Sequence, residues 1–451
     1  MKIIIAGCGK VGYTLAEQLL EEKHEITLIY KQSEKLKSIS ERIDVNGICG
    51  NATSYLIQQE AGVKDADLFI AVTNQDEINL LCCLIAKKAG NCHTIARVRN
   101  PEYYAEIGFI KEELGLSLAI NPELAAASKI LHLIQVPSAL ELDTFAKGKI
   151  NLVHFTIPSG SCWHNLKLSD AAKYGPNLLI CVVERVDHSL IIPNGNTVLY
   201  EGDSVSIIIP PYRMNSLFSK LGLTTKVIKN VMIAGGGTIA YYLARQLLSA
   251  KISVKIIELN QERSEELSEL LPNATIIRGD ASNETLLHEE GLHQMDAFVS
   301  LTNYDEENIM LSLYAHKVSS AKLITKINKI SFENVINEIP IGSIISPKYL
   351  TAEYIIQYVR SMQNSVGSNV ETVYRLMDNR VEAVEFIVKE ESKVTGIPLA
   401  KLKTKENVLL CNILRYGKII IPSGQDMIQV GDSVVIVTTE KGMDDILDIL
   451  A

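Results

Sequence analysis

The sequence has no segment suited to crossing a membrane or to leaving the cell. Across its 451 residues, no apolar run approaches the roughly 18 residues that a membrane-spanning helix needs. The longest candidate, Leu80–Ala86, has a length typical of a buried helix. Met1 and Lys2 lead directly into a predicted strand, which leaves no room for a signal peptide. We therefore expect a cytoplasmic protein.

Clusters of positive charge and metal-ligand spacings are also missing. The net charge is −9, the isoelectric point is near 5.6 and no basic run occurs, which argues against nucleic acid as a partner. The eight cysteines form no Cys-x-x-Cys or zinc spacing, and the nine histidines are scattered. We predict small buried thiols, no disulfides and no metal site.

What the chain does contain is a duplicated glycine loop. Residues 7–12 read GCGKVG after one predicted strand, and residues 235–240 read GGGTIA after another, 228 positions later. A single Gly-x-Gly-x-x-Gly is a weak signal. Two such loops, each opening a half-chain of the same layout, indicate tandem nucleotide-binding units.

Short apolar strands alternate with amphipathic helices around these loops. In the first half, strands are predicted near residues 2–6, 25–30, 45–49, 67–72 and 93–97, and helices near 10–22, 33–42, 53–60 and 75–89. This alternation is typical of βαβ units whose parallel sheet is covered by helices on both faces. In the second half, the helix after the glycine loop has apolar residues at the same positions as the first helix of the first half. We therefore predict two Rossmann-like, doubly wound α/β domains.

A smaller lobe is predicted after each of these domains. It is preceded by a helix near 122–135 or 347–363 and by a less regular stretch at 136–149 or 364–380. The β-rich segments that follow carry Ile-Pro-x-Gly and Gly-Asp-Ser-Val in both halves, and a polar joint at 222–229 separates the halves. We predict small α+β lobes, and the expected domains are 1–121, 138–222, 229–346 and 366–451.

The glycine loops have the chemistry of a pyrophosphate site. The glycines allow a tight turn and a close approach of the backbone, and the helix N-terminus offers unpaired N–H groups. An acidic residue ending the second strand then accepts hydrogen bonds from ribose hydroxyls. Glu258 has this position, whereas the first half has Tyr30 and Lys31. A hydrogen bond to a charged group contributes about 1.5–3 kcal/mol, so we expect weaker NAD binding at the first loop.

Three further points leave alternatives open. Arg97 and Lys326 each end a fifth strand, where a cation either binds a phosphate or is simply solvated. Trp163, the single tryptophan, is interpreted as a buried aromatic, with a partner contact as the alternative. An NAD-dependent oxidoreductase with tandem Rossmann domains is the rival function. The absence of any Tyr-x-x-x-Lys pair and the small, repeated second lobes argue against it.

The series Gly-x-Ala-Thr/Ser, Thr-Asn-x-Asp and Ile-Pro-x-Gly with Gly-Asp is duplicated in order and is more specific than the glycine loops. Over essentially the whole chain, the sequence resembles the family of regulatory proteins of Trk potassium uptake, which consist of two tandem RCK (KTN) units. The resemblance implies a regulator without catalytic residues that binds NAD(H), with ATP or ADP as further candidates. It also implies a homotetrameric gating ring on the inner face of the cell membrane, with a Trk-type integral-membrane potassium transporter as partner.

The resemblance also implies which residues bind the nucleotide. At the first site they are Gly7, Cys8, Gly9, Lys10, Val11, Tyr30, Asn51, Thr73, Asn74 and Arg97. At the second site they are Gly235, Gly236, Gly237, Thr238, Ile239, Glu258, Asp280, Thr302, Asn303 and Lys326. Tyr30 departs from the aspartate that the family usually has, and Asn51 lacks the charge of its counterpart Asp280.

Overall fold

The first half begins with a parallel six-stranded sheet in the order β3-β2-β1-β4-β5-β6, which is the doubly wound order. The computed structural model describes residues 1–136, 139–145, 150–170, 178–223, 227–328, 336, 339–364, 370–376, 380–440, 442–443 and 445–451. The strands are β1 (Lys2–Ala6), β2 (Glu25–Tyr30), β3 (Asn46–Cys49), β4 (Leu68–Ala71), β5 (His93–Arg97) and β6 (Leu118–Ile120). The helices are α1 (Lys10–Glu21), α2 (Ser33–Ser40), α3 (Tyr55–Glu60), α4 (Asp76–Gly90), α5 (Pro101–Ala105) and α6 (Ile107–Leu114).

The second half repeats this arrangement in the order β16-β15-β14-β17-β18-β19. Its strands are β14 (Asn230–Ala234), β15 (Ser253–Glu258), β16 (Thr275–Arg278), β17 (Ala297–Ser300), β18 (Lys322–Lys326) and β19 (Ser343–Ile345). Its helices are α9 (Thr238–Ser249), α10 (Gln261–Leu270), α11 (Glu284–Glu289), the short η2 (Leu292–Gln294) and α12 (Asp305–Val318). The predicted pair of doubly wound domains is confirmed. We call them the first and second Rossmann lobes.

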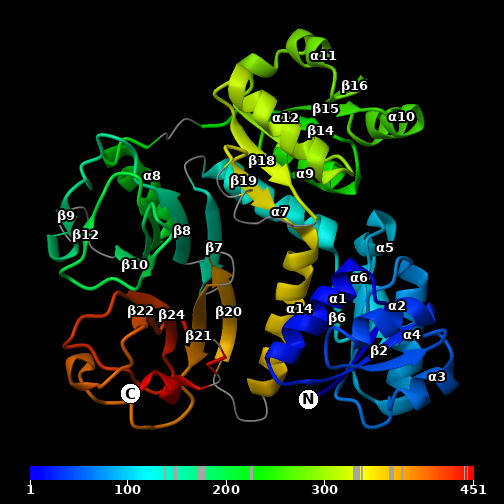
Figure 1. Ribbon diagram of the computed structural model, residues 1–451, viewed down its shortest axis with the longest axis horizontal. Helices are drawn as coiled ribbons and strands as arrows, with labels where there is room; N and C mark the ends of the chain where they lie inside the picture. Colours follow the sequence, from blue (N-terminus) through cyan, green and yellow to red (C-terminus); the bar gives the residue numbers. More distant parts are fainter. Residues whose placement is uncertain are drawn as a thin grey trace.

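The two Rossmann lobes exchange a helix. α7 (Pro122–Gln135) follows the first sheet, but its Ile130 and Leu133 share a hydrophobic core with Leu243 and Leu247 of α9. α14 (Pro347–Asn364) follows the second sheet and packs in the same way against α1 of the first lobe. Figure 1 shows both crossings, α7 under the second Rossmann lobe and α14 beside α1. Cutting the chain between its halves would expose these apolar faces, so binding has to be measured on the whole chain.

The C-terminal lobes are built on antiparallel five-stranded sheets in the orders β11-β10-β13-β8-β7 and β20-β21-β24-β22-β23. The first lobe contains β7 (Glu141–Phe145), β8 (Ile150–Thr156), β9 (Leu166–Lys167), β10 (Leu179–Glu184), β11 (Leu190–Ile191), β12 (Val198–Leu199), β13 (Ser204–Ile209) and α8 (Pro211–Lys220). The second contains β20 (Val370–Leu376), β21 (Val381–Ile387), η3 (Leu399–Lys401), β22 (Val408–Arg415), β23 (Lys418–Ile420), β24 (Ser433–Thr438) and η4 (Ile446–Ile449).

Two stretches that were expected to be irregular contain strands. β7 lies within 136–149 and pairs with β8, and β20 lies within 364–380 and pairs with β21. β7 has only five residues, and polar residues interrupt the apolar pattern of both strands, so the alternation that marks a strand is weak in them. Pairing with the next strand along the chain satisfies their backbone groups, which local pattern does not reveal.

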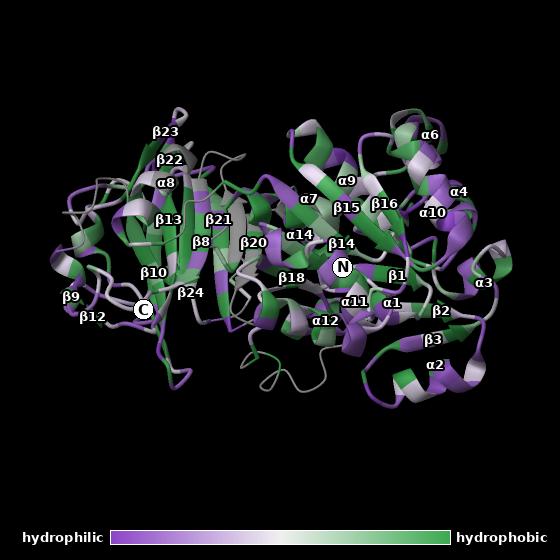
Figure 2. Ribbon diagram, turned by 90° about the horizontal axis from the view of Figure 1, so that it is seen from above, coloured by the Kyte–Doolittle hydropathy of each residue, from purple (hydrophilic) through white to green (hydrophobic). Residues whose placement is uncertain are grey.

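The two C-terminal lobes pack against each other through their sheets. Leu152 and Val182 of the first lobe share a core with Val435 and Val437 of the second. Figure 2 shows the matching apolar strands of both lobes in green and the polar outer surfaces in purple. Trp163 is fully buried, with its ring centroid 6.0 Å from that of Phe155, which confirms its interpretation as a buried aromatic residue.

Among the described residues, no helix combines the length and apolarity needed to span a bilayer.

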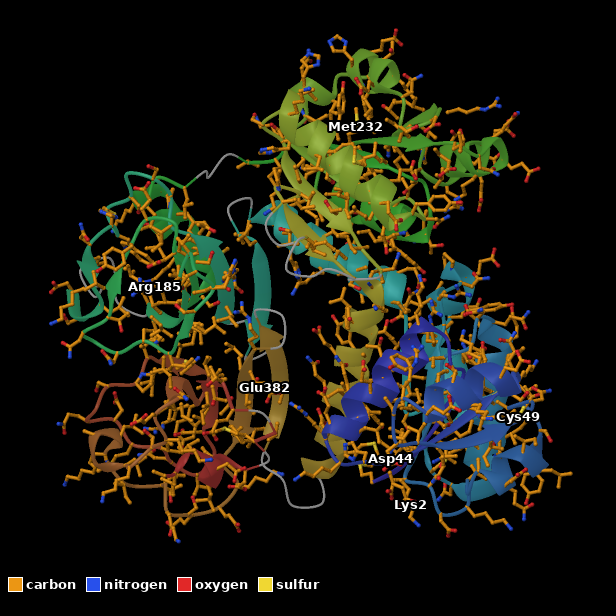
Figure 3. The ribbon with its side chains drawn as sticks, in the orientation of Figure 1. Lys2, Asp44, Cys49, Arg185, Met232 and Glu382 are labelled. Carbon is orange, nitrogen blue, oxygen red and sulfur yellow. The ribbon has the colours of Figure 1, made fainter. Side chains whose placement is uncertain are left out.

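The prediction of buried thiols holds for six of the eight cysteines. Burial raises the pKa of Cys8 to about 11 and that of Cys82 to about 12, so both are neutral near pH 7. Cys49 and Cys162 are exposed, and for them the prediction was wrong. Cys49, labelled in Figure 3, ends β3, which is the edge strand of the first sheet. An edge strand is covered less completely than the central strands of a sheet.

His154 on β8 makes the stability of the C-terminal lobes depend on pH. Burial lowers its pKa from 6.5 to about 4, the nearby Arg380 lowers it further, and Glu184 opposes the shift. Between pH 6.5 and about pH 4, His154 therefore binds a proton in the unfolded chain but not in the folded chain. We expect the free energy of unfolding to fall as pH drops from about 6.5 to about 4. His154→Gln should remove this part of the pH dependence in urea denaturation. Identical profiles for both proteins would contradict the assignment.

Candidate nucleotide-binding sites

The predicted residues of each site lie along one edge of a sheet, at the carboxyl ends of its strands. In the first lobe, residues 7–9 join β1 to α1, Lys10 and Val11 begin α1, Tyr30 ends β2, Asn51 follows β3, Thr73 and Asn74 follow β4, and Arg97 ends β5. In the second lobe, residues 235–237 join β14 to α9, Thr238 and Ile239 begin α9, Glu258 ends β15, Asp280 follows β16, Thr302 and Asn303 follow β17, and Lys326 ends β18. Ligands of doubly wound sheets bind at this edge.

The first glycine loop has the geometry of a phosphate cradle. Gly7 has a φ of +108°, which favours glycine, and a Cβ on Gly12 would lie 1.9 Å from the Gly7 carbonyl oxygen. A Cβ on Gly9 would meet nothing within 4 Å, so open space lies over the start of α1. Among the described residues, no side chain caps α1. Its first N–H groups therefore point into open space, as an anion site requires.

The second loop has a similar geometry, but the carboxylate of Glu258 already accepts a hydrogen bond from it. Glu258 Oε2 accepts a hydrogen bond from the Gly236 N–H at 2.6 Å, and Glu258 Oε1 accepts one from the Asn260 N–H at 2.7 Å. A carboxylate has about four lone-pair sites, so Glu258 keeps capacity for a ribose hydroxyl. A Cβ on Gly236 would lie 2.5 Å from Leu267 Cδ1 and 2.8 Å from Glu258 Oε2. The second glycine of this loop thus leaves room for the leucine and for the carboxylate beside it.

Cys8 and Tyr30 stand in the first lobe where the second has Gly236 and Glu258. The Cys8 side chain is buried. The Tyr30 ring has the ammonium of Lys35 at 5.4 Å from its centroid. The two differences are compatible with each other, because a side chain at the second loop position would crowd a carboxylate at the strand end, as the 2.8 Å approach at Gly236 indicates.

A cation that the sequence analysis missed lies beside each loop. Arg263 Nε donates at 2.8 Å to the carbonyl oxygen of Gly236, the residue whose N–H donates to Glu258. Lys35 is the counterpart of Arg263 in the first lobe, and its ammonium lies over the Tyr30 ring. The signal in the sequence is a basic residue five positions after both Glu258 and Tyr30. Each cation lies on the adenosine side of the cradle, where that strand end contacts the ribose.

One buried asparagine in each lobe holds two of the predicted loops together. Asn79 accepts from the Thr73 N–H at 2.8 Å and donates to the Arg97 carbonyl at 2.9 Å. Asn308 makes the equivalent bonds in the second lobe, at 2.8 and 3.0 Å. Both asparagines are fully buried. The sequence analysis did not find them, although each lies six positions after the threonine of the Thr-Asn-x-Asp motif.

Arg97 and Lys326 are buried cations, which excludes the solvated strand ends considered as the alternative. The Arg97 side chain is 14% exposed, its Nη2 lies 3.5 Å from Glu123 Oε1, and its buried Nε has no partner among the described residues. Lys326 Nζ donates to the Leu301 carbonyl at 3.3 Å. Burial lowers the pKa of both groups. A buried donor without a full set of acceptors suits an anionic ligand.

The remaining predicted residues are less closely connected. Among the described residues, Asn51 and Asp280 bond within their own turns, and the Ser282 hydroxyl and N–H lower the pKa of Asp280. The carbonyl of Asn74 accepts from the Arg99 guanidinium. Asn303 is exposed. These side chains line the edge of each site without forming a network.

Charged residues of the two candidate sites lie near each other. Burial lowers the pKa of Lys348 at the start of α14, and Lys10 of the first glycine loop lowers it further. Lys10 acts in the same direction on the pKa of Lys326, while Glu123 opposes it. Asn121 at the start of α7 donates to the Tyr242 hydroxyl at 3.0 Å. An anionic ligand on one loop therefore lies within reach of charges that belong to the other lobe.

Two known domain families match most of the chain, each of them twice. The TrkA-N domain family matches residues 3–122 and 231–347, and the TrkA-C domain family matches residues 152–222 and 383–451. The chain is 32% identical to the Trk system potassium uptake protein TrkA of Haemophilus influenzae, covering 98% of this chain and 96% of that protein. It is 33% identical to the TrkA of Vibrio alginolyticus over the same shares.

Solved structures show the same fold in a channel. The GsuK channel superposes with a TM-score of 0.64 at 16% identity, covering 98% of this chain and 77% of that one. The GsuK channel bound to NAD superposes with a TM-score of 0.62 at 16% identity and the same coverage. At this identity the likeness concerns the fold alone. The sequence relatives and the tandem domain matches show more, namely that the chain belongs to the TrkA family of Trk system potassium uptake proteins.

Proposed function

We propose that the chain is a cytosolic regulatory subunit that gates a Trk-type integral-membrane potassium transporter in response to NAD(H), with ATP or ADP as further ligands. The observation that carries this proposal is the pair of glycine cradles with open space over Gly9 and Gly237. The TrkA relatives supply the link to potassium uptake. GsuK has been solved bound to NAD and bound to ADP, which supports these nucleotides as ligands.

The proposed binding residues are those expected from the sequence, with Lys35, Arg263, Asn79 and Asn308 added. The proposed domains remain 1–121, 138–222, 229–346 and 366–451, within a homotetrameric ring at the inner face of the membrane. α7 and α14 lie between these domains in the chain and cross to the other Rossmann lobe. They are therefore the elements through which binding in one lobe would move the other.

The proposed mechanism is a shift between two arrangements of the lobes. A ligand shifts such an equilibrium only by its difference in affinity for the two states, typically about 1–3 kcal/mol per coupled site. A switch from 1:99 to 99:1 needs about 5.5 kcal/mol, which several linked sites can supply together. Several copies of the site then make the lobe arrangement more sensitive to nucleotide, and the nucleotide dissociates chemically unchanged.

The packing of the C-terminal lobes favours this function over an oxidoreductase. A substrate domain has to cover the nicotinamide end of its cofactor. Here the C-terminal lobes bury their sheets against each other, and α14 stands between them and the first Rossmann lobe in Figure 1. Two copies of the proposed nucleotide site, together with C-terminal lobes that contact each other, support a regulatory role.

Alanine at Gly9 and Gly237 tests the assignment of the cradles. Neither glycine has a positive φ, and a Cβ at either position meets nothing within 4 Å, so Gly9→Ala and Gly237→Ala should leave the melting temperature nearly unchanged. Each Cβ would occupy the space assigned to the pyrophosphate. Calorimetry on the whole chain should therefore show one of two NAD(H) sites lost in each single variant and both lost in the double variant. Wild-type stoichiometry in the double variant would refute the assignment.

A further inference from the structure

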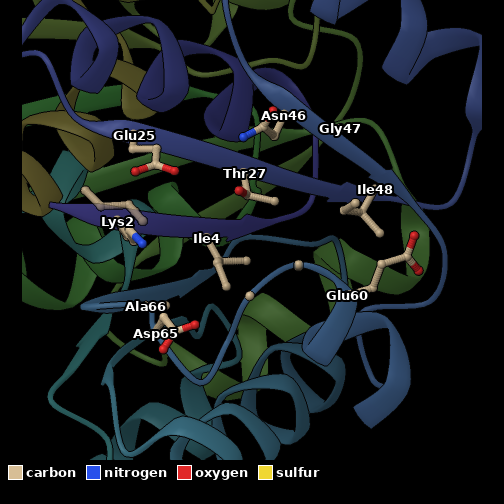
Figure 4. A pocket seen from close by; sticks show the side chains of 13 residues that line it. Lys2, Ile4, Glu25, Thr27, Asn46, Gly47, Ile48, Glu60, Asp65 and Ala66 are labelled. Atoms are coloured by element: carbon tan, nitrogen blue, oxygen red, sulfur yellow. The ribbon is translucent and has the colours of Figure 1, made fainter.

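A cavity of about 340 Å³ opens at the end of the first Rossmann sheet that is remote from the glycine loop. It lies over the amino-terminal halves of β1 and β2, beside β3 and the end of α3. Figure 4 shows Thr27 and Ile4 at its centre, with Glu60 on one side and Lys2 and Glu25 on the other. Its size falls within the range of small-molecule sites, about 300–1,000 Å³.

The same place in the second Rossmann lobe is filled by larger side chains. Lys255 stands where the first lobe has Thr27, Glu290 where it has Ala61, and Met295 where it has Ala66. Lys255 Nζ donates to the Glu290 carbonyl at 2.8 Å and lies 3.2 Å from Glu290 Oε2. The second lobe therefore carries an alkyl chain and an ammonium in the volume that is open in the first.

The charges around the cavity suit a cation. The titratable groups that line it are the carboxylates of Glu25, Glu60 and Asp65 and the ammonium of Lys2, and all four residues are exposed. The carboxyl-terminal end of α3 also lies here, and carbonyl groups at a helix end favour positive charge. Ile4 and Ile48 supply an apolar floor for a hydrocarbon chain.

We propose that this cavity binds a linear aliphatic amine, whose ammonium takes the place that Lys255 Nζ has in the second lobe. The hydrocarbon chain lies over Ile4 and Thr27, and the carboxylates at the rim accept hydrogen bonds from the ammonium. A diamine uses the site most fully, because carboxylates stand on both sides of Thr27 in Figure 4. The site is independent of the nucleotide loops, which lie at the opposite ends of the same strands.

Calorimetric titration of the whole chain with 1,5-diaminopentane tests the proposal. We expect one saturable site per chain, weakened by salt because the rim carboxylates are exposed. The neutral isostere 1,5-pentanediol should bind at least about tenfold more weakly, since it lacks the charged hydrogen bonds. The double variant Thr27→Lys with Ala61→Glu places the second lobe's own pair in the cavity and should lower the affinity by at least about tenfold.

Two further variants keep the test decisive. Thr27→Val preserves the size of the cavity and should bind the diamine as the wild type does. Glu60→Gln with Asp65→Asn alters only exposed side chains and should lose binding even if the cavity-filling variant folds poorly. NAD(H) affinity should stay unchanged in all of them. An absence of saturable binding, equal binding of the diol, or wild-type affinity in both charge-altering and cavity-filling variants would overturn the proposal.

Discussion

Cys8→Gly combined with Tyr30→Glu is expected to strengthen NAD(H) binding at the first site by about tenfold to a hundredfold, because it supplies the charged hydrogen bonds to ribose. Tyr30→Glu alone should change the NAD(H) affinity of the first site very little. In the second lobe a Cβ on Gly236 would lie 2.8 Å from the Glu258 carboxylate and 2.5 Å from Leu267, so we expect the Cys8 side chain to crowd a carboxylate at position 30. Calorimetry on the Gly237→Ala background isolates the first site for this comparison.

The matched control is Cys8→Gly alone, which should leave the affinity of the first site almost unchanged. The reverse exchange in the second lobe, Gly236→Cys with Glu258→Tyr, should weaken binding there by a similar factor. If Tyr30→Glu alone strengthened binding as much as the double substitution, the two positions would be independent. The proposed exclusion between loop side chain and carboxylate would then be wrong.

Arg360→Met is expected to destabilise the chain by about 3–5 kcal/mol, because removal of one partner leaves buried charge uncompensated. Arg360 lies on α14 and is 10% exposed; its Nη2 is 2.6 Å from Glu22 Oε1 and 3.9 Å from Glu382 Oε1. Glu22 follows α1, and Glu382 lies on β21, on the side of that lobe nearer α14 in Figure 3. The loss should appear as a lower urea midpoint for the transition that reports on α1 and α14.

Arg245→Met provides the control for this prediction. Arg245 is exposed on α9, where its guanidinium lies over the Tyr241 ring at 5.6 Å, and loss of such a contact costs about 1 kcal/mol or less. Adding Glu22→Met to Arg360→Met should recover part of the stability, since it removes one of the two buried carboxylates that lose their ion pair with Arg360. Equal midpoints for Arg360→Met and Arg245→Met would contradict a stabilising role of the buried ion pairs.

Arg360 also connects the first candidate nucleotide site to a C-terminal lobe. α1 starts at the first glycine loop and ends beside Glu22, so the ion pairs run from the far end of α1 through α14 to β21. A displacement of α1 on ligand binding would act directly on these pairs. This is a physical contact between the proposed sensor and the lobes that would report it.

The fold was predictable from the sequence where local pattern determines structure. The glycine loops, the period of the helices and the apolar strands around residues 2–6 and 231–234 led to two doubly wound lobes. The three-residue strands β6 and β19 were missed because they are too short to show a pattern. β7 and β20 were missed because their pairing with β8 and β21, rather than their own residues, makes them strands.

The candidate site was predictable in its positions but not in its contacts. Spacing placed Glu258 and Tyr30 at the ends of their strands, yet it did not reveal that Glu258 spans the loop to the Gly236 N–H. Asn79 and Asn308 are repeated in the sequence, but their role follows only from the two loops that each one joins. The exchange of α7 and α14 is a property of packing between lobes, which neither half encodes alone.

Potassium flux is the measurement that tests the central claim most directly. The chain would be reconstituted with a Trk-type potassium transporter in vesicles, and flux would be compared with and without NAD(H), ATP or ADP. Our account predicts a nucleotide-dependent change in flux with the wild-type chain and no change with the Gly9→Ala and Gly237→Ala double variant, although this variant is folded. Flux that responds to nucleotide equally with both proteins, or with neither, would contradict it.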